Sequence, residues 1–183
     1  MTETAAAIPG YGVGMWTIDR ENSAVSFTVR HLGVARVHGR FNIFDGVIET
    51  GDTVEQSSVI VRIETESIDT GFPARDAYIC GDNVLATDQY KVLTFRSTRV
   101  RRQEERFLID GEMTLRDVTK DVTLVAELGG FGTDPMSGAA VLGVSASAVI
   151  NRTDIGLAPQ VPAAVVGDPV QITLDIQASL NTA

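Results

Sequence analysis

The sequence contains one cysteine, Cys80, among its 183 residues. A single thiol excludes an internal disulfide framework and a zinc site built from several cysteines. Neither His31 nor His38 lies near Cys80 in the sequence. We therefore interpret Cys80 as a packed thiol rather than a catalytic nucleophile, and we predict no metal and no cofactor.

Positive charge is scarce, with 15 lysines and arginines against 24 acidic residues and a formal net charge of −9. An acidic chain repels phosphate backbones, so we predict no nucleic-acid partner. The densest basic run is Arg99, Arg101 and Arg102, and Glu104 and Glu105 follow it at once. This pattern favours a solvated hairpin end over a phosphate-binding site.

Long apolar runs are also missing. Nothing in the sequence approaches the roughly 20 apolar residues of a membrane-spanning helix, so we predict no integral membrane segment. Residues 1–14 contain no lysine or arginine and no long apolar stretch, which argues against a secretory signal and favours a cytoplasmic protein. We expect residues 1–14 to be flexible and residues 15–180 to form one domain.

A period of two residues dominates the rest of the sequence. Apolar and polar residues alternate clearly at 25–29, 59–63, 93–97, 122–128 and 170–176, and further strands are expected at 41–49, 107–115 and 141–150. Such alternation is typical of strands with one face toward a core. About eight strands with one or two short helices predict an all-β protein, either an antiparallel barrel or a sandwich.

Turns and helices are predicted from the interruptions of this pattern. Gly129-Gly130 and Gly167-Asp168-Pro169 are turn signals, whereas Asp45-Gly46 and Asp110-Gly111 lie inside apparent strands and favour a bulge as much as a hairpin. The segment 72–85 lacks alternation, and its proline at 73 can begin a short helix. A second and weaker helical candidate is 31–37.

Aromatic residues make up only 6% of the chain, and many expected inward positions are valine or alanine. Small walls leave room inside a barrel of about eight strands for one small ligand. The alternative is a solid core closed by phenylalanines. The alternation alone does not decide between these two interiors.

Catalytic motifs are absent from the sequence. The glycine-rich run at 10–14 follows no predicted strand and opens no helix, which argues against a phosphate cradle. His31 and His38 lack a third partner for a metal. The adjacent Arg75 and Asp76 either fix the loop around the helix or, as the functional alternative, bring Arg75 to the polar head of a ligand.

Several short motifs, in this order, resemble the YceI-like family of lipocalin-like, polyisoprenoid-binding proteins. They are WTID (16–19), VRHLG (29–33), VHGRF (37–41), FDG (44–46), SIDT (67–70), GEMTLRDVTK (111–120), INRTD (150–154) and VVGD (165–168). The resemblance runs from residue 16 to about residue 178. It implies an extended eight-stranded antiparallel barrel that holds a long isoprenoid-type lipid, with no catalysis.

The resemblance also implies where a ligand lies. We expect it to be contacted by inward residues and by residues near the mouth of the barrel, namely Phe27, Val29, His31, Phe41, Arg75, Asp76, Tyr78, Asn83, Leu85 and Phe95. The segment 77–85 departs from the family pattern, because Tyr78 replaces a histidine and Cys80 replaces an arginine. With only one arginine left in 72–90, we predict that a neutral head group is preferred over a diphosphate.

Two other functions remain open from the sequence. One is a solid-core barrel that acts as a structural or protein-interaction module without a ligand. The other is an enzyme that acts on a prenyl lipid, with Asp76 and Tyr78 as acid and base. A homodimer is also open, because relatives are often dimers and an exposed strand edge favours pairing.

Overall fold

The computed structural model describes residues 8–182 of the chain. Within them the strands are β1 (Gly14–Ile18), β2 (Ala24–His31), β3 (Ala35–Phe41), β4 (Phe44–Thr50), β5 (Ser58–Glu64), β6 (Ile68–Asp69), β7 (Val92–Gln103), β8 (Arg106–Leu115), β9 (Val118–Thr133), β10 (Ala140–Asn151) and β11 (Val166–Leu180). The helices are α1 (Pro73–Cys80) and the short 3₁₀ helices η2 (Arg20–Asn22), η3 (Val54–Gln56), η4 (Thr65–Ser67) and η5 (Arg152–Ile155). No helix in the described part is long and apolar enough to cross a membrane.

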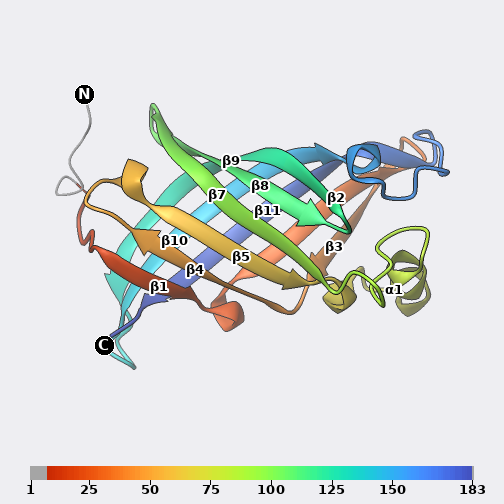
Figure 1. The fold of residues 1–183 in the computed structure, drawn as a ribbon. Coiled ribbons are helices and arrows are strands. Elements are labelled where there is room, and N and C mark those ends of the chain that lie inside the picture. The colour runs from red at the N-terminus through yellow and green to blue at the C-terminus, as the bar shows by residue number, and fades with distance from the viewer. Residues whose placement is uncertain (1–7, 183) are drawn as a thin grey trace.

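Eight antiparallel strands close into a barrel in the order β1-β4-β5-β7-β8-β9-β10-β11. The last strand returns to the first, with Trp16 opposite Leu180 and Ile18 opposite Ala178. The predicted eight-stranded barrel is therefore confirmed. Figure 1 shows the long strands winding around the elongated body.

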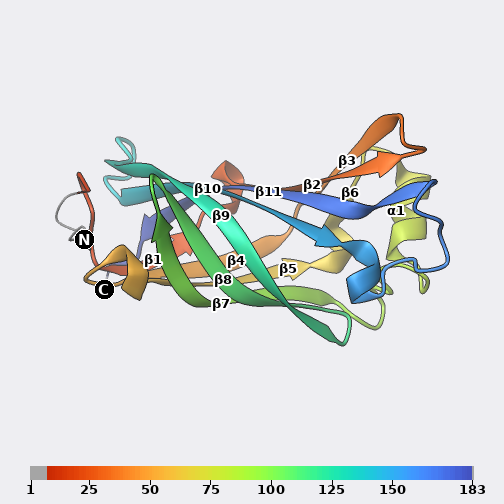
Figure 2. The ribbon, with the colours of Figure 1, turned by 90° about the horizontal axis from the view of Figure 1, so that it is seen from above.

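The strands β2, β3 and β6 extend this sheet beyond the closed barrel. β11 pairs with β1 only through its last residues, and its earlier part, residues 166–175, pairs with β2. β2 and β3 form a hairpin, and β6 pairs with the end of β3. Figure 2 shows this hairpin curling away from the barrel at the end that carries α1.

The alternation of the sequence sets which face of each strand lies inside. In β11 the even-numbered residues 170–176 are half-buried and the odd-numbered residues 171–175 are exposed. β10 pairs with it in regular register, with Ala146 opposite Leu174. Apolar side chains of both strands therefore meet in the interior, and the predicted strand at 170–176 is confirmed.

Two of the predicted turns are wrong, because the strands continue through them as bulges. The register between β9 and β10 shifts at Gly143, opposite Gly130, and that between β11 and β2 shifts between Val166 and Val170. Asp110-Gly111 also lies opposite a shift, in β7. Glycine tolerates the twist of a bulge, so these signals mark bends in long strands rather than their ends.

The helical candidates have different outcomes. Helix α1 confirms the stronger one, with a proline in its first turn. The weaker candidate at 31–37 is wrong, because Leu32 and Gly33 adopt positive φ angles of 54° and 68° in a tight hairpin turn between β2 and β3. The strand expected at 41–49 is confirmed as β4, although it begins only at Phe44, because Asn42 and Ile43 separate it from Phe41 at the end of β3.

Candidate functional site

The interior of the barrel contains a cavity of about 200 Å³. Engineered cavities of about 150 Å³ with apolar walls bind benzene, so this space is large enough for an apolar group. All eight barrel strands contribute to its wall, together with β2 and β3. Its apolar lining includes Ile18, Val25, Phe27, Phe41, Ile48, Val59, Val61, Ile63, Leu93, Phe95, Val100, Phe107, Ile109, Met113, Val122, Leu124, Ala126, Leu128, Phe131, Leu142, Val144, Ala146, Ile172, Leu174 and Ile176.

The cavity is long compared with its volume. Along β9 its lining extends from Val122 to Phe131, and the nine residue-to-residue steps between them span about 30 Å. With the usual tilt of barrel strands, the length along the axis is about 20–25 Å. A long and narrow apolar space fits a chain better than a compact ring system.

No charged side chain lines this cavity in the described part of the protein. Its polar lining residues carry only hydroxyl groups, namely Tyr11, Ser26, Thr50, Ser57 and Ser58. Several apolar wall residues, such as Ile172 and Leu174, are only half-buried because they face the cavity. The wall therefore suits an uncharged, apolar ligand.

Two glycines make room for aromatic rings on the wall. The ring of Phe27 lies where a side chain at Gly39 would be, and the ring of Phe95 lies where a side chain at Gly111 would be. Both glycines are buried. Because the rings rest against glycine backbone, they take up less of the bore. In the sequence, Gly111 indicates only a turn or a bulge, and nothing near Gly39 predicts this role.

One end of the barrel, here called the aromatic end, is formed by Tyr11, Trp16 and Phe131. The rings of Tyr11 and Trp16 meet that of Phe131 edge-on, with centroids 5.2 and 5.4 Å away. Trp16 is 1% exposed, and its Nε1 donates to the Thr50 hydroxyl at 2.8 Å. The Tyr11 hydroxyl donates to the Gly51 carbonyl. Tyr11 belongs to the segment predicted to be flexible, of which residues 1–7 lie outside the described residues.

The opposite end, here called the capped end, is formed by α1 with the loop after it and by the loop after η5. Its buried side chains include Leu85, Ile155 and Ala158. None of them lines the cavity, and they pack in one buried cluster with wall residues such as Phe95 and Met113. We therefore interpret them as the closure of this end of the bore.

The guanidinium of Arg152 holds the capped end together from inside. The residue is 4% exposed, and its nitrogens donate to five backbone carbonyl oxygens, at 2.6–3.2 Å, of Leu157, Ala158, Val161, Val166 and Gly167. Three of these carbonyls lie in the loop after η5 and two lie at the bulged start of β11, so the cation binds carbonyls where regular sheet pairing is missing or interrupted. Sequence reasoning placed Arg152 in a family motif but did not find this role.

Arg116 ties the two loops of the capped end to one another. Its guanidinium donates to the Gly156 carbonyl at 2.7 Å and to the Val84 carbonyl at 3.3 Å. The same group lies over the Tyr90 ring. One cation therefore joins the segment after α1 to the segment after η5.

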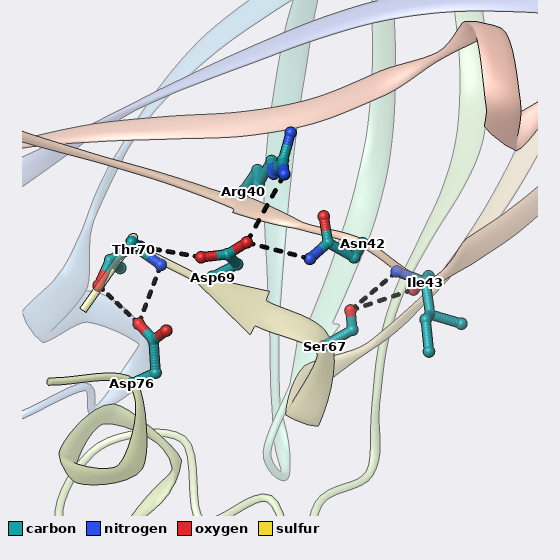
Figure 3. A network of polar contacts seen from close by, with 8 residues as sticks. Arg40, Asn42, Ile43, Ser67, Asp69, Thr70 and Asp76 are labelled. Carbon is teal, nitrogen blue, oxygen red and sulfur yellow. Dashed lines mark hydrogen bonds and ion pairs between the residues drawn. The ribbon is translucent and has the colours of Figure 1, made fainter. Parts of the chain in front are cut away.

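The charged pair at the start of α1 fixes the loop before the helix. Arg75 donates from its guanidinium to the hydroxyl and the carbonyl of Thr70, both at 2.8 Å, and Asp76 accepts from the Thr70 amide and hydroxyl. Figure 3 shows the Asp76 side chain below Thr70. Asp69, the residue before Thr70, pairs with Arg40 of β3. These contacts are those of the loop-fixing alternative, and neither residue lines the cavity.

The ten predicted ligand contacts thus lie in three regions, namely the cavity wall, the β2–β3 hairpin and the capped end. Phe27, Phe41 and Phe95 line the cavity, whereas the other seven do not. Val29 and His31 continue β2 toward the hairpin tip, Leu85 is buried in the capped end, and the Asn83 carbonyl accepts from the Ala158 amide. Contact of any of the ten with a ligand stays a prediction.

The other reactive residues are arranged as follows. Tyr78 is 56% exposed on α1, and residues two apart on a helix do not face one another, which separates it from Asp76. Burial raises the pKa of the Cys80 thiol, which disfavours the nucleophilic thiolate. His31 and His38 lie on opposite faces of the hairpin. No group of three or more metal-ligating side chains occurs within residues 8–182.

Comparison with known proteins agrees with this geometry. The profile of the YceI-like domain matches residues 16–178. A UPF0312 protein of Yersinia pestis is 36% identical over 126 residues, which cover 67% of this chain and 66%, just under two thirds, of that relative.

Two solved structures share the fold. BcnA of Burkholderia cenocepacia superposes with a TM-score of 0.79 at 18% identity, covering 87% of this chain and 98% of that one. A polyisoprenoid binding domain from Saccharophagus degradans, implicated in plant cell wall breakdown, superposes with a TM-score of 0.68 at 16% identity, covering 93% and 100%.

Proposed function

This chain belongs to the YceI-like family, and we propose that it binds the apolar chain of an isoprenoid-type lipid inside its barrel, for carriage or storage. The observation that carries this proposal is the elongated cavity with no charged residue in its described wall. The Saccharophagus degradans domain, described as polyisoprenoid-binding, supports it through its shared fold. We assign no chemical step to the cavity.

The energetics of such binding come from the wall. Burial of each CH₂-sized group contributes about 0.8 kcal/mol, so a few prenyl units in an apolar bore bind tightly without polar contacts. Some of this gain is offset by the lost freedom of the chain. A methyl-branched chain also matches a wall built mostly of branched aliphatic side chains.

Filling the bore tests this proposal. Ala126 and Ala146 face each other across β9 and β10, and both line the cavity. Ala146→Phe is expected to reduce the capacity for a polyprenol at least tenfold in a fluorescence titration, because the new ring occupies the space of the chain. The matched variant Thr173→Phe, on the exposed face of β11, should bind as the unaltered protein does. Equal binding by both folded variants would place the lipid outside the barrel.

We further propose that the lipid has a neutral head group, such as a quinone or a free prenyl alcohol. Burying a diphosphate requires several donors or a metal, and only hydroxyl-bearing side chains accompany the apolar wall. Side-by-side titration of a prenyl alcohol and a prenyl diphosphate of equal length should favour the alcohol. Tighter binding of the diphosphate, with an affinity that falls steeply as salt rises, would contradict this assignment. Binding in the cytoplasm stays a prediction, to be checked by cell fractionation.

A further inference from the structure

The hairpin of β2 and β3 differs in charge from the rest of the molecule. Residues 24–41 contain three arginines and both histidines of the chain but no aspartate or glutamate, although the whole chain has a net charge of −9. Cross-strand partners share a face of a hairpin. The pairs Thr28–His38 and Arg30–Arg36 therefore place their cations and His38 on one side.

Two of these arginines stand directly opposite one another without a carboxylate. Arg30 faces Arg36 across the hairpin, both are exposed, and neither forms an ion pair with any described residue. Arg40, further down the hairpin, does have such a partner in Asp69 at 3.6 Å. Like charges opposite each other destabilise a sheet, so this pair costs stability unless an anion outside the chain meets it.

The tip of the same hairpin is apolar. Leu32 is 55% exposed and Val34 is 84% exposed. Leu32 also has a φ of 54° and precedes Gly33 with a φ of 68°. His31 pairs with Ala35, so Leu32 lies in a three-residue loop. A positive φ angle favours glycine or asparagine, so the backbone of Leu32 is strained, and full burial of its side chain does not offset this strain.

A second uncharged segment lies beside the tip. The Leu32 amide donates to the Val165 carbonyl at 2.9 Å, and Val165 is 39% exposed. Val165 ends a run, residues 157–165, that contains no charged residue. The tip and this run together present apolar side chains flanked by Arg30 and Arg36.

We propose that this surface, formed by Leu32, Val34 and Val165 with Arg30 and Arg36, docks on an anionic lipid bilayer. The apolar tip enters the boundary between head groups and acyl chains while the arginines meet lipid phosphates. The acidic remainder of the protein is repelled by the same surface, which orients the hairpin toward it. Docking does not depend on a ligand in the cavity, so it does not rest on the proposed function.

Co-sedimentation with vesicles tests the arginines. The full chain is expected to bind vesicles of phosphatidylcholine with about 30% phosphatidylglycerol, to bind pure phosphatidylcholine weakly, and to dissociate as ionic strength rises. Each arginine near an anionic surface strengthens binding about fivefold, so Arg30→Gln with Arg36→Gln should weaken it about 30-fold. The matched control, Arg62→Gln with Arg96→Gln on the outer wall of β5 and β7, changes net charge equally and should have little effect.

The tip is tested by a substitution that the turn itself favours. Leu32→Asn should leave the thermal unfolding midpoint unchanged or raise it, because asparagine tolerates the positive φ angle at this position better than leucine does. Combined with Val34→Ser, it should weaken vesicle binding about tenfold through the lost apolar contact. A fall in binding together with unchanged stability separates docking from folding.

The proposal is overturned if the full chain binds anionic and neutral vesicles equally, or if it binds neither kind of vesicle. It is also overturned if the two control substitutions weaken vesicle binding as much as the two hairpin substitutions do. Polyprenol titration of the same variants keeps the two proposals apart. Vesicle binding without polyprenol binding would support docking and contradict the proposed function. Polyprenol binding without vesicle binding would support the proposed function and contradict docking on a bilayer. The exposed hairpin surface would then be a candidate contact for a protein partner.

Discussion

The two ends of the barrel are closed by different chemistry. At the capped end, Arg152 and Arg116 bind backbone carbonyls of irregular loops, and buried aliphatic residues complete the closure. At the aromatic end, three rings and a few hydroxyl groups close the structure. The cavity lining includes Tyr11, Thr50 and Phe131 of the aromatic end but no arginine of the capped end.

This difference explains how one barrel can be both stable and hollow. An irregular loop exposes carbonyls that no strand can satisfy, and a guanidinium with five N–H donors satisfies several of them at once. These cations stay behind the buried side chains of the capped end, away from the apolar bore. The strands at the aromatic end continue almost to the three rings. Their carbonyls are therefore paired within the sheet, and no guanidinium is required to bind them.

Removing the central cation should have the largest effect on stability. Arg152→Met leaves five carbonyls without their donor, and we expect the free energy of unfolding to fall by about 3–5 kcal/mol. Urea unfolding measures it. Arg96→Met, at an exposed position of β7, should change stability by less than about 0.5 kcal/mol. Equal effects of the two substitutions would mean that Arg152 does not hold the capped end.

Removing one hydroxyl at the aromatic end should have a smaller effect. Thr50 is 5% exposed, and its hydroxyl accepts from Trp16 Nε1 and donates to the Gly12 carbonyl. Thr50→Val keeps the shape but leaves these groups unpaired, at a cost of about 1–3 kcal/mol. Thr173→Val, on the outside of β11, is the matched control and should cost little. A loss larger than that of Arg152→Met would reverse the ranking of the two ends.

Arg75 distinguishes a loop-fixing cation from a ligand-binding one. Because its guanidinium is bound to Thr70, Arg75→Ala should lower stability by about 1 kcal/mol. The affinity for a polyprenol should stay unchanged in the same titration that tests Ala146→Phe. A clear loss of affinity at unchanged stability would instead assign Arg75 to the ligand.

The smallest expected effect is on the pH dependence of stability. The carbonyls that Arg152 binds do not titrate, whereas the carboxylate of Asp110 does. Asp110 accepts two hydrogen bonds from Arg101, both at 2.7 Å, and one from Thr123, and these lower its pKa to about 2. A lowered pKa stabilises the fold above the ordinary value near 3.8, and the contribution is lost as the pH falls toward 2.

Asp110→Asn should therefore flatten the pH dependence of stability in this window. Urea unfolding at a pH of about 5 and of about 2.5 measures the difference between the two proteins. Arg96→Met should show the same dependence as the unaltered protein, whereas Arg152→Met should alter it slightly, because the charge of Arg152 helps to lower the pKa of Asp168. An unaltered pH dependence in Asp110→Asn would mean that the pair with Arg101 does not contribute.

The barrel could be predicted from the sequence because the pattern that indicates each strand lies within that strand. Alternation in β11 places Ile172 and Leu174 inside, and the prediction needs only neighbouring residues. The contacts of Arg152 depend on where a distant loop returns, so its local sequence carries no signal for them. The need for glycine at position 39 also has no local signal, because it depends on the ring of Phe27, which lies on the neighbouring strand.

Which of the predicted ligand contacts line the cavity depends likewise on how segments distant in the sequence are arranged. Phe27, Phe41 and Phe95 follow from strand alternation, and they line the cavity. The resemblance places the α1 segment near the mouth, but neither the resemblance nor the interrupted alternation says whether this segment opens the barrel or closes it. The buried Leu85 belongs to the closure.

The central claim is that the bore holds an apolar chain, and organic extraction of the purified protein followed by mass spectrometry tests it most directly. The unaltered protein should release a long-chain isoprenoid with a neutral head group, and Ala146→Phe should release at least tenfold less, whereas Thr173→Phe should release as much as the unaltered protein. Extracts of all three that contain no long-chain species, together with no uptake of added polyprenol, would contradict the account.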